Sequence, residues 1–129
     1  MPAQEAEAIE RAVQCYIDGA KAGDASKLRE GFDERGWMFG SLGDHRYDMP
    51  LPEYIAMADG QPGDTDGSYK ARIVSLEQVG DAATVVLEEE GFWGSVSFTD
   101  FFTLAKVEGS WKIVNKTFVH TGGEPPSFE

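Results

Sequence analysis

Residues 97–119 read SFTDFFTLAKVEGSWKIVNKTFV and contain two runs of alternating side chains around Glu108-Gly109. Aromatic, β-branched and threonine residues on both sides of a short polar break are typical of a β-hairpin. The pattern predicts strands over Ser95–Val107 and Ser110–Val119, joined by a two-residue turn. The expected pairs are Val107–Ser110, Leu104–Ile113, Phe102–Asn115 and Asp100–Thr117.

Side chains alternate between the two faces of a strand, so this register divides the hairpin into two faces. The face with the larger apolar groups should pack against helices, and it carries Phe98, Asp100, Phe102, Leu104, Trp111, Ile113, Asn115 and Thr117. The wetter, outer face carries Thr99, Phe101, Thr103, Ala105, Val107, Lys112, Val114, Lys116 and Phe118. On this outer face, Phe101, Val114 and Phe118 form an apolar patch, which predicts a homodimer through the sheet.

Asp100 is the acidic residue among the inward-facing groups. A buried carboxylate without partners is costly, so we expect it to be neutral, hydrogen-bonded or beside water in a cavity. A cavity at the mouth of a curved sheet satisfies this requirement. A one-residue slip in the hairpin would instead turn Asp100 outward.

The other elements follow from hydrophobic periodicity and from turn-forming residues. Residues 2–24 predict a helix that stops at Gly23, and Asp24 can cap a second helix over Ala25–Phe32. Pro52 suits the first turn of a third helix that ends at Gly60. Strands are expected over residues 36–41 and 45–49, and over Tyr69–Gln78 and Ala82–Glu90.

This order predicts an α+β fold with helices on one face of a curved, mostly antiparallel sheet. Its 129 residues fit a single domain, and we expect the tail from about residue 120 to be flexible.

The net charge of −12 disfavours nucleic acids and anionic membranes as partners, because both are bound through clustered cations. No apolar run is long enough for a membrane helix, and the acidic N-terminus lacks the features of a signal peptide. The single cysteine, Cys15, is consistent with a reducing cytoplasm. We expect no metal and no cofactor, because no zinc pattern or phosphate-binding loop is present.

The segments YIDGAKAGD, VGDAATVVL and EGSWKIVNK, together with the element order, resemble the nuclear transport factor 2-like superfamily. The resemblance covers about Ala8–Phe118 and is closest to the bacterial, SnoaL-like branch described as "putative lumazine-binding". It implies a cystatin-like α+β cone, in which three N-terminal helices pack on the curved sheet around a pocket, and a homodimer through that sheet.

The ketosteroid isomerase-like members of this superfamily use a tyrosine on the first helix and an aspartic acid on a late strand as hydrogen-bond donors. The resemblance places Tyr16 and Asp100 at these positions and makes them the candidate catalytic residues. The base of those members would fall near Gly40 or Ser41, and neither residue can abstract a proton from carbon. The candidate ligand-binding residues are Tyr16, Met38, Phe98, Asp100, Phe102 and Asn115.

Each candidate also has a structural interpretation. Tyr16 can be a core tyrosine, and Asn115 can serve only to satisfy Asp100. Of Glu88, Glu89 and Glu90, alternation turns at most one inward, and a solvated strand edge is the simpler interpretation. Phe92 and Trp93 can close the pocket or pack on a dimer neighbour.

Three functions remain open. The first is a binding protein for a small, apolar ring compound, which the inward acid and the missing base favour. The second is a cofactor-free isomerase, cyclase or dehydratase that uses Asp100 as acid or base. The third is an interaction module without a ligand, which predicts no cavity of ligand size.

Overall fold

The computed structural model describes residues 5–125 and contains three helices and six strands in that range. The helices are α1 (Ala6–Ala22), α2 (Ala25–Gly31) and α3 (Leu51–Ala58). The strands are β1 (Phe32–Leu42), β2 (His45–Pro50), β3 (Lys70–Val79), β4 (Ala82–Phe92), β5 (Val96–Val107) and β6 (Ser110–Gly122). Within the described residues, none of the helices is long and apolar enough to span a membrane.

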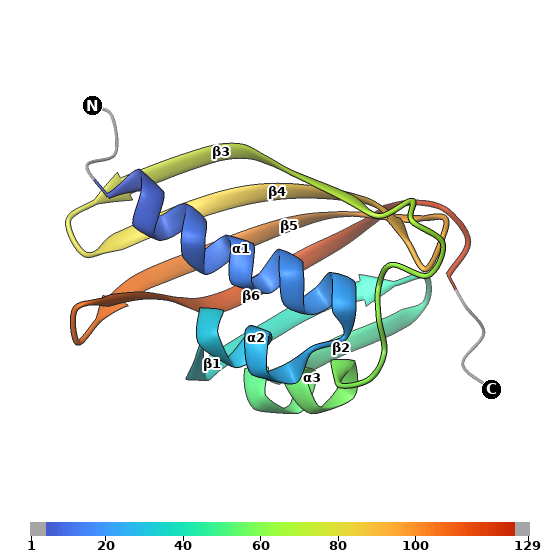
Figure 1. Cartoon of the computed structure of the whole chain (residues 1–129), viewed down its shortest axis with the longest axis horizontal. Helices are drawn as coiled ribbons and strands as arrows, with labels where there is room; N and C mark the ends of the chain where they lie inside the picture. Colours follow the sequence, from blue (N-terminus) through green and yellow to red (C-terminus); the bar gives the residue numbers. More distant parts are fainter. Residues whose placement is uncertain (1–4, 126–129) are drawn as a thin grey trace.

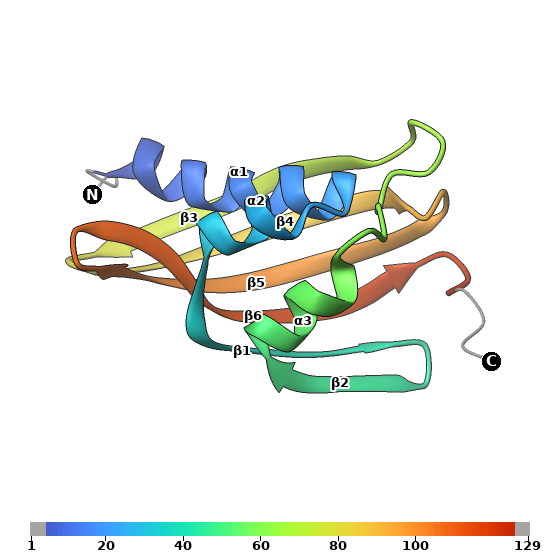
Figure 2. The same cartoon turned by 60° about the horizontal axis from the view of Figure 1, so that its bottom comes forward.

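The strands form one curved sheet in the order β2-β1-β6-β5-β4-β3. All neighbouring pairs are antiparallel except β1 and β6, which are parallel, so the sheet is mixed. Helix α1 crosses one face of the sheet (Figure 1), and Figure 2 shows that α2 and α3 lie on the same side. Because α3 follows β2 in the chain, the helices are not three consecutive N-terminal elements, which corrects that part of the expected cone.

The residues predicted to start or end helices are found at the helix termini. Gly23 ends α1 in the left-handed conformation, with φ of 67°. The Asp24 side chain caps α2 by accepting hydrogen bonds from the backbone N–H groups of Ser26 and Lys27. Pro52 lies in the first turn of α3. The first residues of the predicted first helix lie outside the described range.

Two strand boundaries differ from the predictions. Helix α2 ends at Gly31, and β1 begins at Phe32, four residues before the predicted strand. Strand β6 continues to Gly122, so the first residues of the predicted flexible tail belong to the sheet. The end of that tail, residues 126–129, lies outside the described residues.

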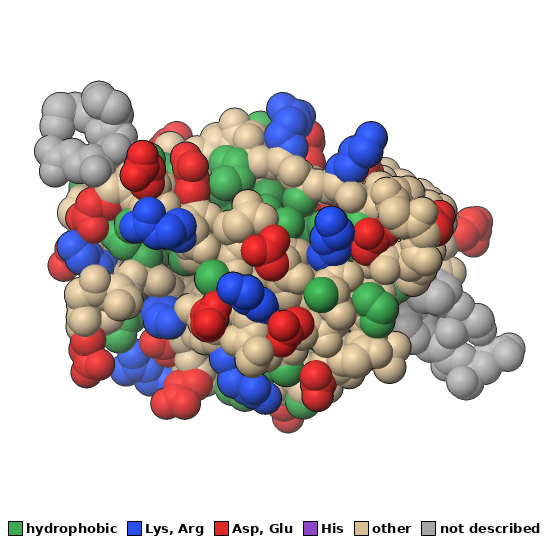
Figure 3. All heavy atoms as spheres, in the orientation of Figure 1, with side chains coloured by type: hydrophobic (Ala, Val, Ile, Leu, Met, Phe, Trp, Pro, Cys, Tyr) green, Lys and Arg blue, Asp and Glu red, His purple; other side chains and the backbone are tan. Residues whose placement is uncertain are grey.

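The core lies between the helices and the concave face of the sheet. The buried face of α1 includes Ile9, Val13 and Tyr16, which pack against inward residues such as Phe102 and Leu104. On the helix-covered side of the molecule, acidic and basic side chains are interspersed, and apolar groups show between them (Figure 3).

The β5–β6 register matches the prediction only near the turn. Val107 pairs with Ser110 and Leu104 with Ile113, but Thr103 then pairs with Asn115, so Val114 is an extra residue on β6. Such a β-bulge turns every later side chain of the bulged strand to the opposite face. Because the slip occurs on β6, the faces of β5 are unchanged and Asp100 stays on the inner face.

The bulge corrects the predicted outer patch. Phe118 is buried and not exposed, whereas Trp37, Phe39, Phe101 and Val119 are each at least 40% exposed. Phe39, Thr117 and Phe101 occupy one row across β1, β6 and β5. An apolar outer surface therefore exists, but it is built from β1 as well as from the hairpin.

Candidate functional site

Asp100 lies on the inner face of β5 and is 0% exposed. Among the described residues, neither of its carboxylate oxygens accepts a well-directed hydrogen bond from an N–H or hydroxyl group. The Lys116 ammonium lies 3.2 Å from Oδ1, so the two residues form a buried ion pair. Such a countercharge offsets part of the cost of burying a carboxylate.

Lys116 comes from β6, beyond the bulge, and is 5% exposed. Its ammonium lies 4.4 Å from the ring centre of Phe118, 5.3 Å from that of Tyr54 and 5.4 Å from that of Tyr16. Aromatic faces at these distances attract a cation. The positive charge is therefore held by one carboxylate and three rings.

A second carboxyl group, that of Glu89, is buried next to this pair. Glu89 pairs with Phe98 across β4 and β5, while Asp100 pairs with Leu87, so the two acids are diagonal neighbours on the inner face. The Tyr16 hydroxyl donates to Glu89 Oε1 at 2.9 Å, and the Tyr69 hydroxyl donates to Oε2 at 2.6 Å.

Burial raises the pKa of Glu89 well above its ordinary value, and the negative charge and hydrogen bond of Asp100 raise it further. Lys116 and the Tyr69 hydroxyl act in the opposite direction but do not reverse the shift. A protonated Glu89 can donate its hydrogen to Asp100, which is the donor that Asp100 otherwise lacks. Lys116, Asp100 and a protonated Glu89 together carry no net charge, as a buried site requires.

The tyrosine hydroxyls are held in their protonated form. Burial, followed by the charges of Asp100 and Glu89, raises the pKa of Tyr16 well above its ordinary value. Burial and Glu89 raise the pKa of Tyr69 in the same way. Both hydroxyls therefore remain hydrogen-bond donors at neutral pH.

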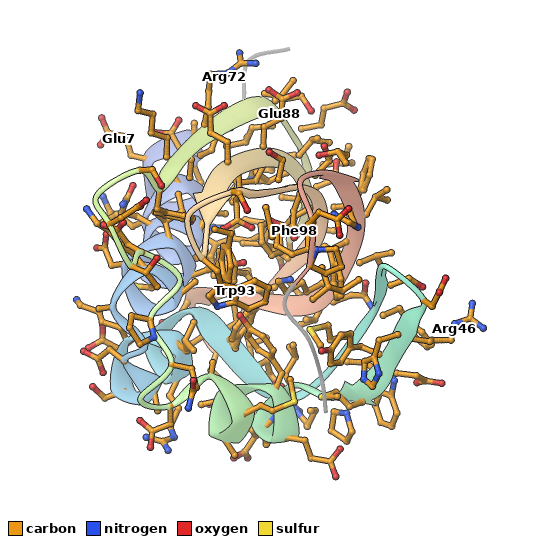
Figure 4. All side chains as sticks on the ribbon, turned by 90° about the vertical axis from the view of Figure 1, so that its right-hand side faces the viewer. Glu7, Arg46, Arg72, Glu88, Trp93 and Phe98 are labelled. Atoms are coloured by element: carbon orange, nitrogen blue, oxygen red, sulfur yellow. The ribbon has the colours of Figure 1, made fainter. Side chains whose placement is uncertain are left out.

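A cavity of about 450 Å³ opens between the helices and the inner face of the sheet, beside Lys116. Its lining includes Tyr16, Ala20, Met38, Leu42, Tyr47, Tyr54, Met57, Ala58, Gln61, Phe92, Trp93, Phe98, Lys116 and Phe118. Lys116 is the one charged residue in this described lining. Trp93 and Phe98 lie inside the curve of the sheet, whereas Arg72 and Glu88 lie on its outside (Figure 4).

The cavity brings together some of the residues selected from the sequence and leaves others apart. Tyr16, Met38 and Phe98 contribute to its lining. Asp100 and Phe102 are buried in the wall behind it and are absent from that lining. Asn115 was expected on the inner face, but the bulge at Val114 turns it outward, where its Oδ1 accepts a hydrogen bond from Thr117.

Sequence reasoning missed two of the three charged residues of this site, Lys116 and Glu89. Strand alternation predicts Lys116 on the outer face, and the bulge that turns it inward has no local sequence signal. The run of three glutamates favours a solvated edge for Glu89, although alternation from Val85 and Leu87, both 0% exposed, extends the inner face to it. Phe92 and Trp93 line the cavity.

These observations define an α+β domain whose curved sheet and helices enclose an aromatic cavity with one buried cation. The family model described as "Putative lumazine-binding" matches residues 4–119. The chain belongs to this family, within the nuclear transport factor 2-like superfamily.

Individual relatives agree with this assignment. A nuclear transport factor 2-like protein of unknown function from Shewanella baltica OS155 is 29% identical, with a TM-score of 0.81, over 93% of this chain and 96% of that one. A protein of the same description from Methylobacillus flagellatus KT is 25% identical, with a TM-score of 0.83, over 94% and 95%. The protein named Aldolase FrzH, from a Cladobotryum species, is 25% identical over 114 residues, which are 88% of this chain and 90% of that protein.

Proposed function

We propose that the protein binds a small, largely apolar ring compound in the cavity, with an oxygen acceptor of the ligand directed at Lys116. The observation that carries this proposal is the lining itself, which is aromatic and aliphatic apart from a few polar groups and contains one cation. Ligand sites commonly combine apolar walls with a small number of fixed polar groups. The volume of about 450 Å³ is sufficient for a compound of one to three rings.

The apolar walls supply affinity and Lys116 supplies orientation. Removing about 200 Å² of apolar ligand surface from water contributes about 5 kcal/mol, which is comparable to the cost of immobilising a small ligand. A charge-assisted hydrogen bond from the Lys116 ammonium adds to this balance and selects ligands with a carbonyl or carboxylate oxygen.

A second candidate function, a cofactor-free enzyme, is supported by the buried set of Lys116, Asp100 and Glu89 beside the cavity. Such perturbed groups are concentrated at catalytic sites. The similarity to a protein named as an aldolase points in the same direction. Asp100 is absent from the cavity lining, so an acid or base role for Asp100 in an isomerase, cyclase or dehydratase would have to run through Lys116.

The third candidate, an interaction module without a ligand, gives no role to a cavity of this size.

The homodimer belongs to the same proposal. The exposed Trp37, Phe39, Phe101 and Val119 on the outer face of the sheet support self-association there. Equilibrium sedimentation of the protein and of its F101E variant would test it, and the variant is expected to be monomeric. A monomeric starting protein would contradict the dimer. The cytoplasmic location stays a prediction from the single cysteine.

Two alanines of α3 provide a matched test of binding. Ala58 lines the cavity, whereas Ala56 is exposed on the same helix and outside that lining. Naphthoate, an apolar ring system with one carboxylate, and lumazine are the probes, and calorimetry measures their affinity. We expect A58W to weaken binding by about ten-fold or more, because the indole fills ligand space, and A56W to bind like the original protein.

Circular dichroism and the thermal midpoint establish that both variants are folded. Equal affinity in A58W and A56W would place the bound probe outside the cavity and overturn the proposal. Failure of the original protein to bind either probe would overturn it as well.

A further inference from the structure

Lys116 offers the cavity a primary amine in an apolar setting. The other lysines of the chain, Lys21, Lys27, Lys70, Lys106 and Lys112, are exposed or half-buried, and none contributes to the cavity lining. An ammonium placed only to stabilise the fold does not need to face a ligand-sized space. Lys116 lies between that space and the buried carboxylate of Asp100, so its amine can contact a bound ligand and a proton acceptor at once.

We propose that Lys116 condenses with the carbonyl carbon of an aldehyde or ketone bound in the cavity and forms a protonated imine, with Asp100 as its proton acceptor and counterion. This inference rests on the proposed function, because the carbonyl compound must first occupy the cavity. It names the substrate class of the site as apolar, ring-bearing aldehydes and ketones. It also assigns covalent chemistry to a residue that faces the ligand space directly.

The first step is the transfer of one proton from Lys116 Nζ to Asp100 Oδ1, which lies 3.2 Å away. The transfer needs no base from outside the site, because the acceptor oxygen already lies beside the ammonium. The neutral amine then carries the lone pair that attacks a carbonyl carbon. Lys27 and Lys106 also pair with carboxylates, but their partners Glu30 and Glu5 are accessible to solvent. These contacts raise the pKa of both lysines, so their amines stay protonated at neutral pH.

The second step balances without another reagent. The nitrogen–carbon bond forms as the carbonyl π bond breaks, and the carbonyl oxygen becomes a hydroxyl with the nitrogen-bound proton. Asp100 returns its proton to this hydroxyl, which leaves as water while the nitrogen lone pair forms the carbon–nitrogen double bond. Overall, an ammonium and a carbonyl compound give an iminium and one water, so no charge is gained or lost.

The surroundings fit the iminium product as well as the starting ammonium. The iminium nitrogen keeps the positive charge, so its ion pair with Asp100 and its contacts with the rings of Phe118, Tyr54 and Tyr16 retain their sign. Walls with few polar groups oppose the entry of the water that would hydrolyse the imine. An iminium withdraws electrons from the adjacent carbon, so the reactions open to such a site make or break a bond beside a carbonyl group.

Reductive trapping tests the inference. Naphthaldehyde and sodium cyanoborohydride are added to the folded protein at neutral pH, and peptide mass spectrometry measures the labelling rate of each lysine. We expect Lys116 to be labelled about ten-fold or more faster than the other lysines. D100N should slow the labelling of Lys116 about ten-fold, because the amine loses its proton acceptor, while labelling elsewhere stays unchanged.

Two arginine variants are matched controls. K116R keeps the charge but removes the amine, and should lose the fast label. K112R, on the same strand but outside the cavity, should keep it. A58W should slow the labelling of Lys116, and A56W should not.

The outcomes separate this inference from the function on which it rests. Naphthoate binding that is sensitive to A58W, together with Lys116 labelled no faster than the exposed lysines, would overturn the imine and leave the binding function intact. Fast labelling of Lys116 that D100N does not change would overturn the role of Asp100. If neither naphthoate nor naphthaldehyde engages the cavity, both proposals fall.

Discussion

Replacing Glu89 by glutamine should change how the stability of the protein depends on pH. Burial and Asp100 raise the pKa of the Glu89 carboxyl, so the folded state keeps a proton that the unfolded state releases near the ordinary value of 4.5. Between these two pKa values the unfolded state binds fewer protons, and the free energy of unfolding falls as pH rises. Glutamine cannot titrate, so E89Q should lack this fall.

The size of the effect follows from one proton. While Glu89 stays protonated in the folded state, the stability of the original protein relative to E89Q decreases by about 1.4 kcal/mol for each pH unit. From pH 5 to pH 7 the difference can reach about 2.7 kcal/mol, and it levels off once pH passes the folded pKa. Asp24, Asp33 and Asp66 have lowered pKa values, so their contributions are lost below pH 4 and lie outside this window.

Urea unfolding followed by circular dichroism at pH 5, 6, 7 and 8 measures this difference. Glu88 provides the matched control because it is adjacent in sequence but exposed, where it forms an ion pair with Arg72. E88Q should change stability by less than about 1 kcal/mol and should leave the pH dependence above pH 5 almost unaltered. Parallel pH profiles for E89Q and the original protein would refute the claim that folding retains a proton on Glu89.

Urea unfolding of three further variants tests the buried ion pair, the cap of α2 and the close packing at Gly40. K116M should cost about 3–5 kcal/mol, because it leaves a buried carboxylate unpaired, and the double variant K116M/D100N should recover part of this loss; a cost below about 1 kcal/mol would contradict the ion pair. D24A should cost about 1 kcal/mol through loss of the α2 cap, and an unchanged midpoint would contradict that capping role. G40A should cost about 1–3 kcal/mol, because a Cβ atom at Gly40 would lie 2.4 Å from the Phe118 ring. G122A is the control and should be nearly neutral, because a Cβ atom there would lie 3.7 Å from its nearest neighbour. Equal costs for the two variants would contradict the close packing at Gly40.

Local sequence patterns determined most of the architecture. Helical periodicity and the stop at Gly23 place Tyr16 on the buried face of α1, and strand alternation places Asp100 on the inner face of β5. These two assignments depend on neighbours in the same element or across a short turn. The same alternation extends to Glu89, but the adjacent acids Glu88 and Glu90 conceal that signal.

Only the tertiary structure decided which residue of β6 joins Tyr16, Asp100 and Glu89 at the site. The local pattern exchanges Asn115 and Lys116, because it contains no mark for the extra residue at Val114. At this point β6 also meets β1, where a Cβ atom on Gly36 would lie 2.6 Å from the Val114 carbonyl oxygen. The parallel pairing of β1 and β6 joins strands far apart in the chain, so the bulge, and with it the cation in the cavity, depends on contacts that no local window contains.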